Sequence, residues 1–106
     1  MPIISLTGEN FEREVLQAEW PVLVDLFAPW CGPCRALAPV LDTLAEARPE
    51  LRIGKLDVDA QPELAARFDV MTVPTLLLFR SGRLLRRTAG AKTTAELEEF
   101  LRSAEA

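Results

Sequence analysis

Helical and strand patterns alternate along the whole chain, and no linker rich in Gly, Ser or Pro interrupts them. The clearest strand is predicted at residues 22–27, where an apolar and β-branched run is typical of a strand buried on both faces. A second strand is expected at about 52–58. Because a chain of 106 residues can bury only one sizeable core, the alternation predicts a single α/β domain over residues 1–106.

Two helices are predicted in the first half of the chain. The first follows Thr7 as its cap, ends before Pro21 and has apolar residues at helical spacing: Phe11, Val15 and Ala18. The second starts at Pro33 and carries one apolar face: Leu37, Val40, Leu41 and Leu44. The buried strand 22–27 therefore lies between two helices.

Two further helices are predicted in the second half. Pro62 suits the first turn of a short helix that carries two apolar residues at a four-residue spacing, Leu64 and Phe68. Thr93 and Glu96 form a possible capping box at the start of a terminal helix. The apolar stripe of that helix is Leu97, Phe100, Leu101 and Ala104.

A β-hairpin is predicted between these two helices, because residues 75–79 and 83–85 read as strands on either side of Ser81-Gly82. Parallel strands joined by helices and followed by a hairpin predict a mixed central sheet covered on both faces.

The charge of the chain argues against a nucleic-acid or membrane partner. The formal net charge is −4 and the isoelectric point is near 4.8, and a negative surface does not attract polyanions. The main basic cluster is interrupted by apolar residues and is interpreted as a solvated strand face: Arg80, Arg83, Arg86 and Arg87. No secretory signal pattern and no bilayer-spanning apolar run is seen, so a cytoplasmic protein is expected.

Cys31 and Cys34 are the only cysteines, and four interpretations compete: a structural disulfide, metal ligands, a redox pair or buried thiols. A closed zinc site takes four ligands, and the chain has no His, so no metal is expected. A disulfide across so short a loop stabilises by only about 2 kcal/mol. The redox interpretation is favoured, because the pair lies where a buried strand ends and a helix begins, and a helix N-terminus stabilises a thiolate.

The two cysteines are expected to have different roles. Cys31 lies at the helix start, should be the more exposed and is predicted to attack a substrate disulfide. Cys34 lies one turn further, should be shielded and is predicted to resolve the mixed disulfide.

Asp25 lies in the middle of the apolar strand, and two interpretations remain open. It is either a residue on a solvated face or held by a structural hydrogen bond, or a buried general base that takes the proton of Cys34 through a water molecule. Lys55, in the following strand, is either its buried partner or a surface residue.

Residues 24–34 (Val-Asp-Leu-Phe-Ala-Pro-Trp-Cys-Gly-Pro-Cys) resemble the active-site segment of the thioredoxin family. The similarity covers about residues 2–106 and includes further features: Pro39, Val73-Pro74-Thr75, Gly82 and Gly90-Ala91. It implies the thioredoxin fold, in which a central mixed sheet of five strands, with a small one near residues 3–6, is flanked on both faces by four helices. Phe27, Pro29 and Arg35 depart from the commonest family pattern and leave the partner preference open.

The resemblance also implies a binding surface. The Val73–Pro74 peptide bond should be cis and lie beside the disulfide, although most X–Pro bonds are trans. A substrate segment should lie extended, pairing with the backbone at Val73, on a flat and largely apolar surface: Trp30, Gly32, Pro33, Val73, Thr75, Gly90 and Ala91.

The function implied is that of a monomeric protein-disulfide reductase that binds no cofactor. Client proteins with disulfides and a separate NADPH-dependent flavoprotein, thioredoxin reductase, are its expected partners. A donor dedicated to a few targets, and a binding module that acts without redox chemistry, are the alternatives. The sequence favours the reductase and does not separate a general reductase from a dedicated donor.

Overall fold

The computed structural model describes residues 2–105 of the chain, and the side chains of residues 2–102. Met1, Ala106 and the side chain of Ala104 lie outside the described part. The elements, in chain order, are β1 (Ile4–Ser5), the π-helical segment η1 (Glu12–Leu16), β2 (Val22–Phe27), α1 (Gly32–Ala47), β3 (Arg52–Asp57), α2 (Pro62–Arg67), β4 (Thr75–Arg80), β5 (Arg83–Ala89) and α3 (Thr94–Glu105).

The five strands form one mixed sheet in the order β1-β3-β2-β4-β5. Strands β1, β3 and β2 run parallel, whereas β4 is antiparallel to both β2 and β5. The expected mixed five-stranded sheet with four helices is confirmed, and β2, which leads into the cysteine pair, lies at its centre.

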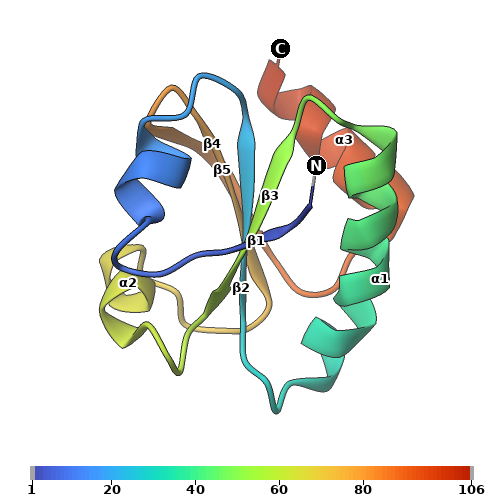
Figure 1. Cartoon of the computed structure of the whole chain (residues 1–106). Coiled ribbons are helices and arrows are strands. Elements are labelled where there is room, and N and C mark those ends of the chain that lie inside the picture. The colour runs from blue at the N-terminus through green and yellow to red at the C-terminus, as the bar shows by residue number, and fades with distance from the viewer. Residues whose placement is uncertain (1, 106) are drawn as a thin grey trace.

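Helices cover both faces of the sheet. In Figure 1 the sheet is seen nearly edge-on, with α1 and α3 on one side and α2 and η1 on the other. Alternate residues of β2 enter different cores: Val22, Val24 and Leu26 pack on the η1 and α2 side, and Leu23 packs on the α1 and α3 side. By the same alternation, Asp25 lies on the face covered by α1.

The segment before β2 differs from the predicted helix. It is a short π-helical segment that ends at Leu16, where the N–H of Gln17 donates to the carbonyl of Glu12. The Thr7 hydroxyl accepts from the N–H of Glu9 instead of capping a long helix. The apolar spacing still predicted burial correctly, because all three marked residues are buried: Phe11, Val15 and Ala18.

The other elements lie close to their predicted positions. Strand β2 has the predicted bounds, α1 begins one residue earlier at Gly32, and β3 ends at Asp57. Helix α2 ends before Phe68, whose ring is partly buried against the core. The first strand is shorter than expected, although the N–H of Leu6 still donates to the carbonyl of Lys55.

The hairpin and the capping box are both confirmed. Strands β4 and β5 pair antiparallel around Ser81 and Gly82, which both have positive φ, and β5 continues to Ala89. Ahead of α3, the N–H of Thr93 donates to Glu96 Oε1 at 2.9 Å, and the N–H of Glu96 donates to Thr93 Oγ1 at 3.1 Å.

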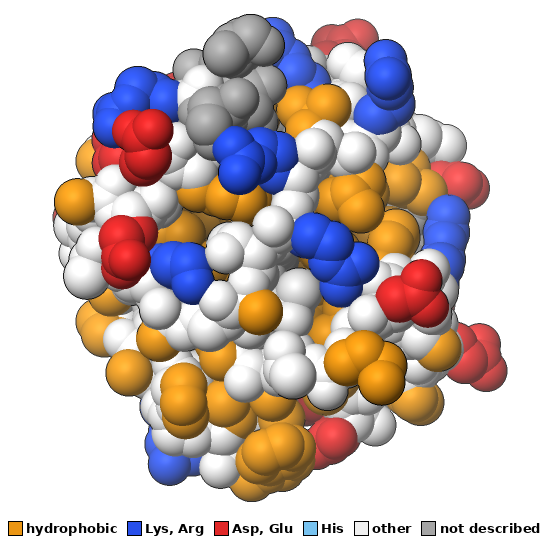
Figure 2. All heavy atoms as spheres, turned by 180° about the vertical axis from the view of Figure 1, so that it is seen from behind, with side chains coloured by type: hydrophobic (Ala, Val, Ile, Leu, Met, Phe, Trp, Pro, Cys, Tyr) orange, Lys and Arg blue, Asp and Glu red, His pale blue; other side chains and the backbone are white. Residues whose placement is uncertain are grey.

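The basic cluster of the hairpin is solvated as predicted. All four of its arginine side chains are exposed: Arg80, Arg83, Arg86 and Arg87. From behind, the Lys and Arg side chains are scattered among other types and form no continuous basic surface (Figure 2). Among the described residues, no helix is long and apolar enough to cross a membrane.

Candidate active site

The two cysteines lie at the junction of β2 and α1. Strand β2 ends at Phe27, and Cys31 is the N-cap residue of α1 in an extended conformation. Cys34 lies in the first helical turn, and the two residues form a disulfide with their Cα atoms 5.2 Å apart. The bond stores a two-electron oxidation, so the pair can exchange with external thiols and disulfides.

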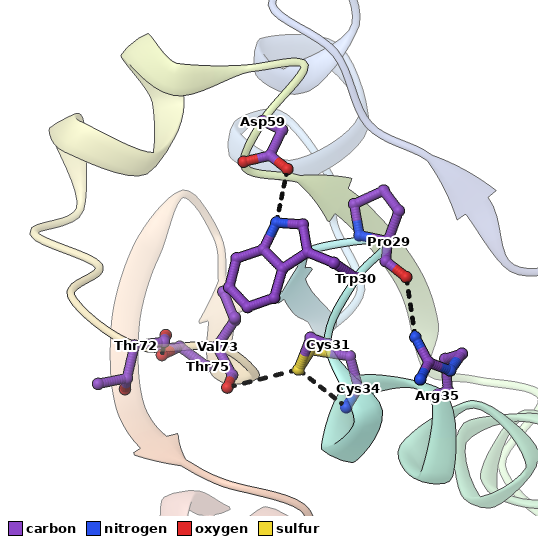
Figure 3. The surroundings of a disulfide bond; sticks show 9 residues. All are labelled: Pro29, Trp30, Cys31, Cys34, Arg35, Asp59, Thr72, Val73 and Thr75. Carbon is purple, nitrogen blue, oxygen red and sulfur yellow. Dashed lines mark hydrogen bonds between the residues drawn. A yellow bond between two sulfur atoms is a disulfide. The ribbon is translucent and has the colours of Figure 1, made fainter.

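The helix start is built to stabilise negative charge on Cys31. The backbone N–H of Cys34 donates to Cys31 Sγ at 3.1 Å (Figure 3). The first turn of α1 contains no acidic residue, so no side-chain charge there opposes the positive end of the helix dipole. When the bond is reduced, the same N–H and dipole favour the thiolate form of Cys31.

The expected difference in exposure between the cysteines is not seen. Cys31 is 4% exposed and Cys34 is 3% exposed. Cys31 is covered because the loop before β4 lies over it, and its Sγ lies 3.7 Å from the carbonyl oxygen of Val73. Burial therefore does not distinguish an attacking from a resolving sulfur.

The loop that covers Cys31 contains the expected cis peptide bond, Val73–Pro74. The hydroxyl of Thr75 donates to the carbonyl of Thr72 at 2.6 Å, and the N–H of Gly90 donates to the carbonyl of Pro74 at 2.9 Å. The loop thus places Val73 beside Cys31 Sγ, and hydrogen bonds connect two further residues of the predicted binding surface, Thr75 and Gly90, to this loop. Ala91 follows Gly90 and is exposed, as are Gly32 and Pro33 in the first turn of α1.

The indole of Trp30 lies beside the disulfide, and the residue is 69% exposed. Its indole Nε1 donates to Asp59 Oδ2 at 2.9 Å, which fixes the ring in Figure 3. Asp59 was not among the residues predicted from the sequence. The sequence signal for it was weak, because Asp57 and Asp59 read as an ordinary polar turn after a strand.

Arg35 lies on the other side of the cysteine pair. Its guanidinium donates to the carbonyl of Pro29 at 3.0 Å, across the turn that joins β2 to α1. Two of the three departures from the commonest pattern, Pro29 and Arg35, therefore contact each other and hold the turn beside Cys34.

Asp25 is fully buried, so a solvated strand face is excluded. Neither carboxylate oxygen has a hydrogen-bond partner among the described residues, so no described side chain or backbone group holds it in place. Burial raises the pKa of Asp25 to about 6, and the positive charge of Lys55 opposes part of this rise.

Lys55 lies opposite Asp25 in the register of β2 and β3 and is partly buried. Its ammonium group lies 4.7 Å from the centre of the Phe27 ring. A pocket of about 180 Å³ opens here and is lined by Phe27, Ala28, Pro29, Cys34, Arg35, Ala38 and Lys55. The pocket borders Cys34 and Lys55, the residue opposite Asp25, and Asp25 itself does not line it.

No group of three or more His, Cys, Asp or Glu side chains that could hold a metal ion occurs in the described part of the chain.

The chain is similar to known proteins of one family. Residues 2–103 match the thioredoxin family. The chain is 47% identical over 95 residues to thioredoxin of Mycobacterium tuberculosis, covering 89% of this chain and 82% of that protein. It is 44% identical over 99 residues to thioredoxin of Alicyclobacillus acidocaldarius, covering 92% and 93%. It is also 47% identical to the bifunctional thioredoxin reductase/thioredoxin of Mycobacterium leprae, of which it spans 21%.

Proposed function

The chain belongs to the thioredoxin family and is a thiol–disulfide oxidoreductase, and we propose that it reduces disulfides in client proteins through Cys31 and Cys34. The observation that carries the proposal is the donation from the N–H of Cys34 to Cys31 Sγ at the start of α1. This contact favours a thiolate on Cys31, and the thiolate is the nucleophile in disulfide exchange.

The proposed reaction has two exchange steps. The Cys31 thiolate attacks one sulfur of the client disulfide, forms a mixed disulfide and expels the other client sulfur as a thiolate. Cys34 then attacks Cys31 Sγ, which expels the second client sulfur and leaves the Cys31–Cys34 disulfide. Two electrons pass from the dithiol to the client, and both client sulfurs leave as thiols after protonation.

Asp25 is proposed to act as the general base for the second step. Cys34 must lose its proton before it attacks, and a carboxylate with a pKa of about 6 is a stronger base than an exposed one. The pocket beside Cys34 and Lys55 can admit the water that would carry the proton from the thiol to Asp25. Lys55 is proposed to support the ionised form of Asp25 by its charge.

Client proteins are proposed to dock on the surface around the disulfide. Trp30 offers an exposed aromatic face, and the Val73 backbone lies beside Cys31 Sγ. An extended client segment that pairs with the backbone at Val73 would bring its disulfide to Cys31. Gly32 and Pro33 support the site, and three further residues complete the proposed contact surface: Thr75, Gly90 and Ala91.

An NADPH-dependent thioredoxin reductase is the proposed source of electrons for the dithiol. The name of the Mycobacterium leprae relative, which joins a thioredoxin reductase and a thioredoxin in one protein, supports this pairing. We further propose that the chain is a cytoplasmic monomer without a bound cofactor.

Reduction of insulin by DTT, followed by turbidity, tests the proposal. The wild type should accelerate the reaction, Cys31→Ser should abolish the acceleration, and Cys34→Ser should accumulate a mixed disulfide with the client. Recycling is then measured with NADPH and a bacterial thioredoxin reductase in place of DTT. A wild-type rate equal to the DTT background would contradict general protein-disulfide reduction.

The role of Asp25 has its own test. In Asp25→Asn the mixed disulfide on Cys31 should resolve more slowly, by roughly a hundredfold if general base catalysis has its usual size. Quenched-flow trapping of the mixed disulfide measures this step. Attack by Cys31 should keep its rate, and an unchanged rate of resolution would remove Asp25 from the mechanism.

A further inference from the structure

Met71 is the most exposed of the large hydrophobic side chains in the described part of the chain, with 90% of its surface accessible. It lies two residues before Val73, in the loop that ends at the cis Pro74. It lines a pocket of about 300 Å³ together with Trp30, Val58, Val70, Thr72 and Val73. An unbranched thioether therefore stands open to solvent beside the proposed client surface.

The sulfur atoms of the described residues differ in their reactivity. In the oxidised protein Cys31 and Cys34 are joined, so neither offers a free thiol to an oxidant. The Met71 thioether is then the oxidisable sulfur in this part of the chain. In the reduced protein the Cys31 thiolate reacts with the oxidant first, and Cys34 then closes the disulfide. Met71 is therefore oxidised only after the dithiol has been converted to the disulfide.

We infer that Met71 is a modification site at which hydroperoxides form methionine sulfoxide and thereby weaken the docking of client proteins. The thioether sulfur gives two electrons to one peroxide oxygen, so an S–O bond forms and the O–O bond breaks. The second peroxide oxygen leaves, with a proton, as water or an alcohol. The effect on clients rests on the function proposed above, whereas the modification itself does not.

The effect on docking follows from the neighbours of Met71. Its pocket is lined mostly by apolar side chains and the indole of Trp30. A sulfoxide is strongly polar, and covering it with a client without a hydrogen-bond partner is unfavourable. Met71 itself is not among the side chains that pack against the disulfide, which are Phe27, Val58 and Val73, so a small disulfide can reach the sulfur pair without covering Met71. Protein clients should therefore be affected more than small disulfides.

The test begins with hydrogen peroxide applied to the oxidised wild-type protein and to Met71→Leu. Tryptic mapping distinguishes the candidate sites, because Met71 falls in peptide 68–80, Met1 in peptide 1–13 and Trp30 in peptide 14–35. Peptide 68–80 of the wild type should gain one oxygen atom, and the same peptide of the variant should gain none. An unmodified peptide 68–80 overturns the inference.

The consequence is measured on the same samples, each compared with its own untreated form. The peroxide-treated wild type should show a KM for insulin that is roughly fivefold higher. Its rate toward a small aromatic disulfide should be unchanged. Met71→Leu should keep its KM after treatment, and Met71→Gln should show the raised KM without treatment. Methionine oxidation with an unchanged KM for insulin, or an equal loss in Met71→Leu, overturns this inference alone. Failure of the untreated wild type to reduce insulin overturns the proposed function and, with it, the effect on clients.

Discussion

At the position of Asp25, folding stability and the proposed chemistry favour different residues. Its side chain is fully buried in the central strand, without a hydrogen-bond partner among the described residues. An apolar residue there would extend the core that Leu23 begins on the same face of β2. The carboxyl group therefore costs folding energy when it is charged, and the proposed proton transfer from Cys34 gives a reason for its presence.

We expect Asp25→Asn to stabilise the fold at pH 7. The pKa of Asp25 rises from an ordinary 3.8 to about 6 on folding, so the folded state favours the protonated form. The stability contributed by this group is fully present below pH 3.8 and is lost as the pH rises to about 6. Above pH 6 the ionised carboxyl group costs about 3 kcal/mol, which the variant avoids.

Urea unfolding of wild type and Asp25→Asn at pH 4 and pH 7 measures this difference. The gain in unfolding free energy should be larger at pH 7 by up to about 3 kcal/mol. Comparing the two pH values cancels the separate cost of burying the amide. An equal difference at both pH values would mean that Asp25 is not held near a pKa of 6.

At the scale of elements, the segment between α2 and β4, which contains the cis Pro74, is contacted at its start by a residue of β5. Arg87 of β5 donates from its guanidinium to the carbonyl of Phe68 at 2.8 Å and to that of Asp69 at 3.3 Å. These carbonyls follow α2, where a helix leaves acceptors without partners. Asp69 also has a positive φ of 53°, which L-residues seldom adopt, so the chain leaves α2 through a defined turn. Arg87 thus connects the end of α2 to the hairpin.

Arg87→Leu should loosen the segment between α2 and β4. Loss of hydrogen bonds from a charged donor is expected to cost about 1 to 2 kcal/mol of unfolding free energy. Amide hydrogen exchange over residues 68–73 should be faster in the variant. Arg83→Leu is the matched control, because it removes the same charge from an exposed position of the same strand. Equal exchange over this segment in both variants would contradict a holding role for Arg87.

At the scale of the whole molecule, two hydrophobic cores share one sheet. Strand β2 contributes Val24 to one core and Leu23 to the other, and β4 contributes Leu77 and Leu76 in the same way. Because both cores pack on the same strands, unfolding of the strands that form one core would also expose the residues of the other core. The central strand of the sheet, β2, also holds Asp25 and leads to Cys31.

The oxidised protein should therefore unfold in a single cooperative transition. Thermal unfolding followed by far-ultraviolet circular dichroism, and by the fluorescence of Trp20 and Trp30, should give coincident curves. The calorimetric and van't Hoff enthalpies should also agree. Separate transitions by the two probes would show that the two faces of the sheet unfold independently.

Local patterns of the sequence determined much of the fold. The apolar run of β2, the apolar face of α1, the turn at Gly82 and the capping box at Thr93 all have local physical causes, and each is observed. The cysteine spacing and the start of α1 likewise predicted a sulfur pair at a helix N-terminus. The resemblance of residues 24–34 correctly implied the family and the cis bond before Pro74.

Only the tertiary structure decided the contacts between distant segments. The near-equal burial of Cys31 and Cys34 arises because a loop some forty residues later covers Cys31, and helical position alone cannot report that. The hydrogen bond from Trp30 to Asp59 and the hydrogen bond from Arg87 to the end of α2 likewise join residues far apart in the chain. Whether Asp25 was solvated or buried also depended on α1 covering its face of the sheet. Hydrogen-bonding and packing partners that lie far apart in sequence leave no local pattern, so such contacts follow only from the folded arrangement.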